Sequence, residues 1–299
     1  MPALPSYDLH CSQNFLKNSD LVAALLGRTN ITCADLVVEI GPGRGILTEQ
    51  LARSCRQVIA VEKDPHLYNL LCQKFSYRPN VRLYQADFLQ YHLPVIPYKV
   101  FANIPFNITS AIVNRLVSAR LPPEDAYLVM QKEAADMYLG IPIETLRTVL
   151  IKPWFGLEVV HRFRRTDFIP TPRVDVVMLR LHRKKQALVA PGAQLSFRDF
   201  IVYAFTSWQP TLGKIFKELF TWQQLKRIRK ELEIDLDGTL TTLSLEQWLG
   251  LYDSFENEAG PQVKRIVLGS EKRLVQQQLK LKKVHRTRTA AKNLRPTVR

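Results

Sequence analysis

The sequence contains few cysteines and no long apolar run. Its four cysteines lie in the first half of the chain without Cys-x-x-Cys spacing, and its six histidines lack the spacing of metal ligands. This pattern argues against a disulfide framework and a metal site, and it favours the reduced thiols of a cytoplasmic protein. No stretch reaches the roughly 18 apolar residues of a membrane helix, and the apolar run 21–26 is too short for a signal peptide. We therefore expect neither a metal nor a membrane partner.

Acidic residues are also scarce. The chain has 27 Asp and Glu against 42 Lys and Arg, which gives a net charge of +15. Residues 280–299 carry eight basic and no acidic side chains, so this end supplies about half of the excess. The remaining body is still basic, and such a balance favours a polyanionic partner.

The first 184 residues alternate short apolar runs with helical patterns. Seven runs have the length and composition of strands, and we expect them at residues 36–38, 57–62, 81–86, 99–103, 126–130, 157–163 and 174–181. The alternation predicts an α/β fold, with a Rossmann-like, mainly parallel sheet between helices. The last two runs have little sequence between them, so we expect them to pair antiparallel at one edge. Candidate helix caps are Asn18, Ser19 or Asp20, then Asp64, then Asn107.

A second domain is predicted after residue 184. Aromatic and aliphatic side chains recur at helical spacing, and a Ser-Leu-Glu-Gln capping box at residue 244 precedes a further helix. We expect residues 1–184 to form a ligand-binding catalytic domain and residues 185–264 to form a small helical domain. Residues 265–299 are basic and poor in aromatic side chains, which predicts a flexible tail.

A glycine turn follows the first predicted strand, in Glu39-Ile-Gly-Pro-Gly-Arg-Gly45. Strand, glycine turn and helix together let the backbone approach a nucleoside closely. A dinucleotide site needs a small residue at the position that Ile46 occupies, so the pattern favours S-adenosylmethionine over NAD. A purely structural turn remains the alternative. Glu62 and Asp87 each end one of the next two strands, where their carboxylates can accept hydrogen bonds from ribose hydroxyls and from the adenine amino group.

The most discriminating stretch is Asn103-Ile104-Pro105-Phe106, at the end of the fourth strand. The amide oxygen of Asn103 and the carbonyl of Ile104 are two acceptors that can stabilise a base amino group as it becomes nucleophilic. Pro105 fixes the turn and has no N–H to compete, and Phe106 offers a face for a flipped base. An ordinary turn at the end of a strand is the alternative.

Several motifs together resemble the ribosomal RNA adenine N6-methyltransferases. They are Gln13-Asn-Phe-Leu16, the glycine turn, Val61-Glu-x-Asp64, Asp87, Asn103-Ile-Pro-Phe-Asn107 and Phe168-Ile-Pro-Thr-Pro-Arg-Val-Asp175. The likeness covers residues 9 to about 260 and implies a sheet of the S-adenosylmethionine methyltransferase type. It also implies a cofactor pocket made by Asn14, Leu16, Gly41, Gly43, Glu62, Asp87 and Asn103, with Phe168 beside the target base.

Within this family, Ile-Pro-Phe in place of Leu-Pro-Tyr is similar to the Erm branch. That likeness implies methylation of one adenine of 23S rRNA and resistance to macrolides, lincosamides and streptogramin B. We expect a monomeric cytoplasmic enzyme. The alternatives are a small-subunit (16S) rRNA adenine dimethyltransferase and a non-catalytic RNA-binding or transcription-factor descendant of the fold. An NAD oxidoreductase is a more distant alternative.

Two basic clusters are candidates for phosphate contacts. They are Arg162, Arg164 and Arg165 before the seventh strand, and Lys226, Arg227, Arg229 and Lys230 in the helical domain. Contacts with phosphates give affinity but carry no sequence information, so specificity would come from RNA shape and an extruded adenine. A solvated helix face is the alternative for the second cluster. The sequence leaves the number of methyl groups, the host, the exact rRNA position, the regulation of expression and the role of the tail open.

Overall fold

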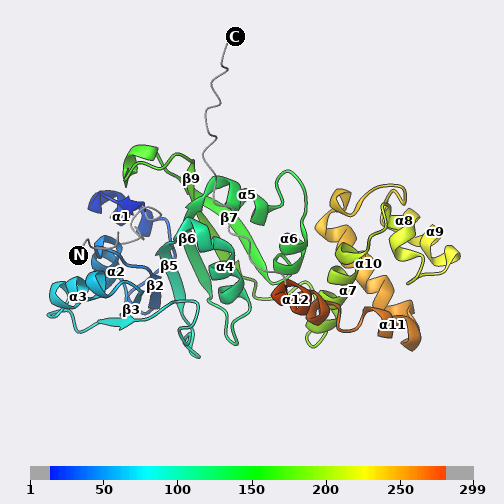
Figure 1. Ribbon diagram of the computed structural model, residues 1–299, viewed down its shortest axis with the longest axis horizontal. Helices are drawn as coiled ribbons and strands as arrows, with labels where there is room; N and C mark the ends of the chain where they lie inside the picture. Colours follow the sequence, from blue (N-terminus) through cyan, green and yellow to red (C-terminus); the bar gives the residue numbers. More distant parts are fainter. Residues whose placement is uncertain (1–13, 281–299) are drawn as a thin grey trace, which may run out of the picture.

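The computed structural model describes residues 14–280, and its centre is a seven-stranded sheet (Figure 1). The strand order is β4-β3-β2-β5-β6-β9-β7. The strands are β2 (Leu36–Ile40), β3 (Gln57–Glu62), β4 (Val81–Gln85), β5 (Lys99–Asn103), β6 (Asp125–Gln131), β7 (Phe155–Arg162) and β9 (Val176–Arg183). The first five in this order are parallel, whereas β9 pairs antiparallel with both β6 and β7. The predicted fold class, all seven strands and the antiparallel edge are confirmed.

Helices cover both faces of the sheet. Successive strand residues point to opposite sides, and in the central strands the residues on both sides are apolar and are buried by helices. On one face Val38, Val100 and Leu128 pack against α4 and α5, and on the other face Val37 and Phe101 pack against α1 and α2. The helices of this part are α1 (Ser19–Leu26), α2 (Ile46–Ser54), α3 (Pro65–Lys74), α4 (Thr109–Val117), α5 (Lys132–Leu139) and α6 (Leu146–Ile151). Burial on both faces explains why the central strands β2, β5 and β6 are largely apolar runs in the sequence.

Two of the three predicted caps are correct. The side chain of Asn18 accepts hydrogen bonds from the first turn of α1, and that of Asp64 does so for α3, whose first residue is Pro65. Asn107 does not cap α4, because it lies within a 3-10 turn, η2 (Phe106–Ile108), and the N-cap position is Ile108. A tight turn after Pro105 therefore delays the helix by one residue relative to the prediction.

A small second sheet pairs segments that are far apart in the sequence. Strand β1 (Phe15–Leu16) lies antiparallel to β8 (Phe168–Ile169), with Phe15 opposite Ile169 and Leu16 opposite Phe168. Each strand has two residues, too few for a periodic pattern, and the sequence did not predict them. The pairing holds the start of the described chain beside the loop between β7 and β9.

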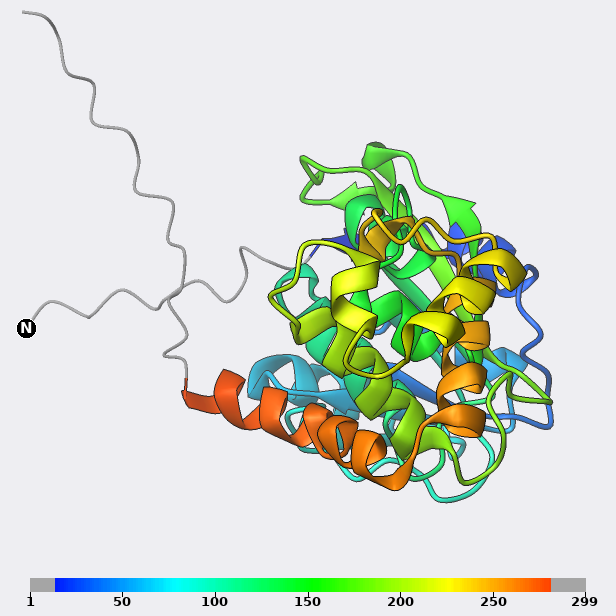
Figure 2. The same cartoon turned by 90° about the vertical axis from the view of Figure 1, so that its right-hand side faces the viewer.

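The residues after β9 form a helical part with a core of its own. Its helices are α7 (Gln194–Thr206), α8 (Leu212–Phe216), α9 (Trp222–Glu231), α10 (Leu245–Glu258), α11 (Pro261–Val267) and α12 (Ser270–Lys280), and they face the viewer in Figure 2. Phe197, Phe200, Phe216 and Trp248 are the largest members of this core. Trp154, just before β7, packs against this core and against the sheet, so it joins the two parts.

The prediction of a flexible tail from residue 265 is wrong for residues 265–280, which complete α11 and form α12. Helix α12 packs along α7, where Arg198 is paired with Glu271. The carboxylate of Asp199 accepts hydrogen bonds from the backbone N–H groups of Gly269 (2.6 Å) and Glu271 (2.9 Å), at the start of α12. The remaining residues, 281–299, lie outside the described part of the chain. Within residues 14–280, no helix has the length and apolar character needed to cross a membrane.

Candidate active site

The carboxyl ends of the parallel strands meet at one edge of the sheet, and the predicted site residues gather there. The glycine turn leaves β2 at this edge, and Gly43 has a backbone φ of +59°, in the left-handed region that favours glycine. A Cβ atom on Gly43 would lie 2.6 Å from the Phe15 ring, so the position also has no room for a side chain. A Cβ atom on Gly41 would meet nothing within 4 Å. The backbone at Gly41 is therefore open to a ligand.

Glu62, at the end of β3, is buried and holds the glycine turn in place. Its Oε2 atom accepts a hydrogen bond from the Gly43 N–H at 3.0 Å, and its Oε1 atom accepts from the N–H groups of Lys63 and Asp64, each at 2.9 Å. The sequence predicted a ribose contact for this carboxylate but not these backbone contacts. A carboxylate oxygen has two lone pairs, so Oε2 keeps one acceptor position beyond the contact with Gly43.

Two neighbouring cavities meet at Gly41. The first, of about 310 Å³, lies over the ends of β3 and β4, and its lining includes Gly41, Glu62, Asp87, Phe88 and Pro105. The second, of about 610 Å³, lies over the end of β2, and its lining includes Phe15, Leu16, Glu39, Gly41, Arg44, Asn103 and Ile169. Gly41 is thus at the junction of an acidic cavity that can hold a nucleoside and a second cavity next to Asn103.

Asp87 lies in the first cavity, as predicted, and it has a partner that the sequence did not indicate. Its Oδ2 atom accepts a hydrogen bond from Lys63 Nζ at 2.9 Å, and its Oδ1 atom accepts from the Leu89 N–H at 2.9 Å. The hydrogen bond from Lys63 keeps the pKa of Asp87 below its ordinary value, and the bond to Leu89 adds to this effect. Asp87 is therefore a carboxylate and a hydrogen-bond acceptor at neutral pH.

Asn103 lies at the wall of the second cavity and is not buried in the core. Its Nδ2 atom donates a hydrogen bond to the carbonyl of Asn14 at 2.6 Å, which fixes the orientation of the amide. The N–H of Ile104 donates to the carbonyl of Val129 at 3.2 Å. Among the hydrogen bonds within residues 14–280, none ends on Oδ1 of Asn103 or on the carbonyl of Ile104. The two acceptors expected from the sequence are thus without protein partners in this part of the chain.

Phe168 lies in the core and not at the cavity wall. Its ring is 1% exposed and packs 5.2 Å from the ring of Phe163, within the core on the sheet face that α1 and α2 cover. No face of this ring is open to a base in this structure, and the expected contact with the target adenine stays a prediction. Phe106, by contrast, is only partly buried, directly after Pro105. Ile169, next to Phe168, is 59% exposed and lines the second cavity instead.

Glu39 is a titratable group of the second cavity that the sequence did not single out. It is 1% exposed at the penultimate position of β2. Burial raises the pKa of Glu39 to about 8, and the nearby carboxylate of Glu62 adds to the effect. The side chain is therefore mostly protonated at neutral pH. The signal available in the sequence was a carboxylate inside an otherwise apolar strand.

The two basic clusters lie on different parts of the molecule. Arg162, Arg164 and Arg165 are exposed at the end of β7, which runs parallel to β6 and so ends at the same edge as the cavities. Arg165 is paired there with Asp175 at 2.8 Å. The second cluster is exposed on α9, where Arg227 is paired with Glu258 and with Glu231 while Lys226, Arg229 and Lys230 carry no ion pair within the described residues. Helix α9 lies at the far end of the helical part (Figure 1).

The fold and the site are typical of a methyltransferase whose cofactor contains a nucleoside. The evidence is the Rossmann-like sheet, the nucleoside-sized cavity at its glycine turn and the two free hydrogen-bond acceptors beside it. Residues 8–257 match the family model described as ribosomal RNA adenine dimethylase. The chain belongs to this family, and it is an S-adenosylmethionine-dependent rRNA adenine N6-methyltransferase. The family, the enzyme class and the cofactor expected from the sequence are confirmed. The open backbone at Gly41 and the carboxylates of Glu62 and Asp87 fit an adenosine-containing cofactor.

Relatives on both branches of the family are similar to this chain. An rRNA adenine N-6-methyltransferase from Bacillus licheniformis is 30% identical over 243 residues, 81% of this chain and 85% of the relative. The ribosomal RNA small subunit methyltransferase A of Listeria innocua is 31% identical over 213 residues, 67% of this chain and 72% of the relative. The crystal structure of the 23S rRNA methyltransferase ErmE matches with a TM-score of 0.74 and 30% identity, covering 81% of this chain and 100% of that chain.

Proposed function

We propose that this enzyme methylates N6 of one adenine in 23S rRNA and thereby confers resistance to macrolides, lincosamides and streptogramin B. The observation that carries the proposal is the pair of free acceptors at Asn103 and Ile104, beside the cavity at the glycine turn. Ile104 and Phe106 occupy the positions that distinguish the Erm branch, and the similarity to ErmE extends over 81% of the chain. The similarity to the small-subunit enzyme of Listeria innocua covers 67%.

In this proposal the chain's own groups prepare the adenine for methylation. Oδ1 of Asn103 and the carbonyl of Ile104 accept hydrogen bonds from the two N–H groups of the adenine N6 amine. These contacts strengthen as the nitrogen becomes pyramidal and nucleophilic, so they lower the barrier more than they stabilise the ground state. Pro105 holds the Ile104 carbonyl in the turn, and Phe106 stacks on the base. S-adenosylmethionine, when bound, supplies an electrophilic methyl group.

The cofactor would be held by residues from the carboxyl edge of the sheet and from the β1 segment. Glu62 accepts hydrogen bonds from the ribose, Asp87 accepts from the adenine amino group, and Gly41 lets the backbone lie against the ligand. Gly43 orients Glu62 through its N–H. The carbonyl of Asn14 accepts the hydrogen bond that orients the Asn103 amide, and Leu16 lines the second cavity.

We further propose that residues 1–184 carry out catalysis and that the helical part from residue 185 onward assists in holding the RNA. The arginines at 162, 164 and 165 would contact phosphates next to the extruded adenine, and the basic side chains of α9 at 226, 227, 229 and 230 would contact phosphates farther away. The enzyme would act as a monomer in the cytoplasm, where ribosomal RNA is available.

The decisive experiment is primer extension on rRNA from cells that express the chain, with antibiotic susceptibility measured in parallel. We expect a stop at one adenine of 23S rRNA, loss of both effects in Asn103→Ala, and reduced susceptibility only with the wild-type enzyme. A stop in 16S rRNA alone would identify the small-subunit dimethyltransferase, the second candidate that the Listeria innocua relative favours. Absence of methyl transfer from labelled cofactor to either RNA would contradict both and indicate the non-catalytic descendant.

A further inference from the structure

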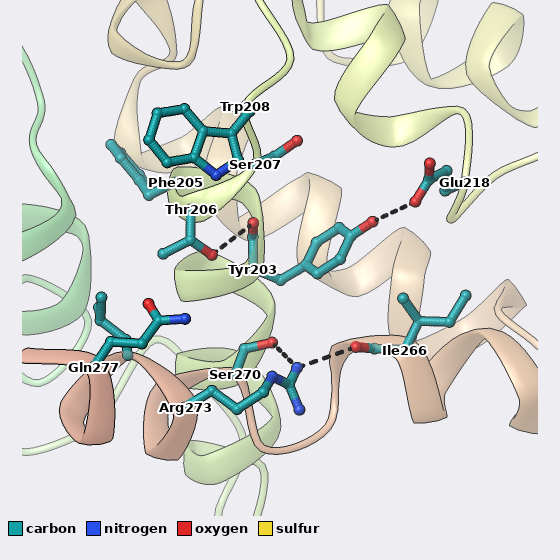
Figure 3. A pocket seen from close by; sticks show the side chains of 11 residues that line it. Tyr203, Phe205, Thr206, Ser207, Trp208, Glu218, Ile266, Ser270, Arg273 and Gln277 are labelled. Carbon is teal, nitrogen blue, oxygen red and sulfur yellow. Dashed lines mark hydrogen bonds between the residues drawn. The ribbon is translucent and has the colours of Figure 1, made fainter.

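A pocket in the helical part lies outside the site described above. It has a volume of about 580 Å³ and is formed where the end of α7 and the following loop meet α8 and α12 (Figure 3). Its lining includes Tyr203, Trp208, Glu218, Arg273 and Gln277. Figure 1 shows α7 and α12 between the sheet and helices α8 to α11, and the pocket lies within the helical part that is proposed to hold RNA.

Trp208 is the most unusual residue of this pocket, because its side chain is fully exposed (100%). A tryptophan buries about 150–250 Å² when it is covered, so this exposed indole offers a large apolar face to a partner. The rings of Trp208 and Phe205 lie on one side of the pocket in Figure 3. Phe205 itself stacks on the buried Trp248, which anchors this end of α7.

The polar groups of the pocket can recognise the edge of a base. Glu218 accepts a hydrogen bond from the Tyr203 hydroxyl at 3.0 Å through Oε2, while its Oε1 accepts none within residues 14–280. The amide of Gln277 is exposed and has no hydrogen bond within the same residues. A carboxylate oxygen accepts from ring N–H and amino groups, and an amide both donates and accepts. Glu218 and Gln277 lie on opposite sides of the space in Figure 3.

The surroundings of the pocket favour a polyanion. Lys214 and Lys217 are exposed on and just after α8, and Lys272 is exposed on α12; none of these has an ion-pair partner in the described part of the chain. Arg273 forms the floor, where its guanidinium donates to the carbonyls of Leu268 (2.8 Å) and Ile266 (3.3 Å). Proteins that bind single-stranded nucleic acid combine positive charges along the backbone with aromatic side chains on which bases stack. This pocket has cations at its rim, an aromatic face, and polar groups that can contact the edge of a base.

We propose, on the basis of the rRNA substrate described above, that this pocket receives an unpaired base of the same RNA, with the Trp208 indole as its stacking face. Glu218 and Gln277 contact the edge of the base, and Lys214 and Lys217 contact the adjoining phosphates. The enzyme therefore binds two extruded bases, one to be methylated and one as an anchor. The anchor gives the helical part a role in selecting the RNA by its single-stranded elements.

The test uses full-length protein and the rRNA fragment that the wild-type enzyme methylates. Since stacking contributes about 1–3 kcal/mol per base, Trp208→Ala should weaken RNA binding about 5- to 150-fold, while Trp208→Phe should keep most of the affinity. The matched control is Tyr77→Ala, which removes a side chain that is 68% exposed beyond α3, away from the carboxyl edge of the sheet. Binding of S-adenosylmethionine should be unchanged in all three variants.

Tryptophan fluorescence gives an independent readout. The chain has four tryptophans, and RNA should quench a component in the wild type that is absent from Trp208→Phe. Unchanged RNA affinity in Trp208→Ala, an equal loss in Tyr77→Ala, or quenching as large in Trp208→Phe as in the wild type would each overturn the inference; the first result would leave a protein partner as the occupant. The methylated nucleotide is mapped in a separate experiment. If it does not lie in 23S rRNA, the RNA affinities of the variants relative to the wild type still test this inference.

Discussion

At the scale of single residues, the proposed chemistry depends on oxygens left without protein partners. Asn103 uses its amide N–H to hold the Asn14 carbonyl and leaves its oxygen free. We expect Asn103→Ala to lower methyl transfer by about 10²–10³-fold, the usual effect of removing one group that stabilises developing charge. The fold should be intact, because the side chain lies at the cavity wall.

Labelled methyl incorporation into rRNA would measure this loss, and circular dichroism would report on the fold. The control is Asn114→Ala, on the exposed face of α4, which should retain wild-type turnover. Full activity of Asn103→Ala would remove the proposed role of the acceptor pair.

Glu39 makes a second prediction at this scale. Because its folded-state pKa of about 8 lies above the ordinary glutamate pKa of 4.5, the folded chain keeps a proton that the unfolded chain releases between these two pH values. The stabilisation by this group is complete below about pH 4.5 and is lost as the pH rises to about 8. Glu39→Gln removes this loss.

Urea unfolding at several pH values would measure the effect. The stability of Glu39→Gln relative to the wild type should increase by up to about 1.4 kcal/mol per pH unit between pH 5 and 8 and then remain constant. Glu49→Gln, a partly exposed carboxylate on α2, serves as the control. A difference between Glu39→Gln and the wild type that does not vary with pH would contradict the buried, protonated state.

At the scale of elements, the carboxylate of Asp199 should decide whether α12 stays on the helical part. It lies on α7 and accepts hydrogen bonds from two backbone N–H groups at the start of α12, as a cap supplied by another helix. Removing a helix cap lowers the free energy of unfolding by about 0.5–2 kcal/mol. The loss is larger when the cap is buried, because the N–H groups are then left without a partner. In Asp199→Ala we expect a lower melting temperature and faster cleavage by trypsin at Lys272 and Arg273.

Asp253→Ala, at an exposed position of α10, should change neither the melting temperature nor the cleavage pattern. If trypsin cut the Asp199→Ala variant no faster than the wild type, α12 would be held mainly by its other contacts with α7.

Elements with a local signal could be predicted from the sequence, whereas elements that depend on distant partners could not. The seven strands of the sheet are short, largely apolar runs that the local sequence indicates. Asn18 and Asp64 cap helices through contacts with residues two or three positions farther along the chain. The two-residue strands β1 and β8 depend on each other across about 150 residues and have no local signal. For this reason the burial of Phe168 was not predictable. The positions of α12 and Lys63 also depend on distant partners, Asp199 and Asp87.

At the scale of the whole molecule, the net charge of +15 predicts strong salt dependence of RNA binding. Arg162 and Arg164 are exposed at the carboxyl edge without ion pairs in the described residues, whereas Arg165 is paired with Asp175. Replacing Arg162 and Arg164 by Gln should reduce the slope of log K against log salt by about 0.7 for each lost contact with single-stranded RNA.

Filter binding across a series of salt concentrations would measure these slopes. The matched control replaces Arg56 and Arg82 by Gln, which removes the same charge at the amino ends of β3 and β4, opposite the cavities. Equal slopes for the two double variants would show that net charge alone, and not these positions, determines the salt dependence.

The pairing of β1 with β8 has a consequence for biosynthesis. Phe15 and Leu16 line the cavity beside Asn103 together with Ile169, which is paired with Phe15 in the adjoining strand, so this wall is complete only after the ribosome has added nearly all of the sheet. A nascent chain interrupted before Phe168 lacks that wall, and contacts between such distant residues form late in folding. A chain that ends before Phe168 should therefore transfer no methyl group, and competence should arise only once most of the sheet has been synthesised.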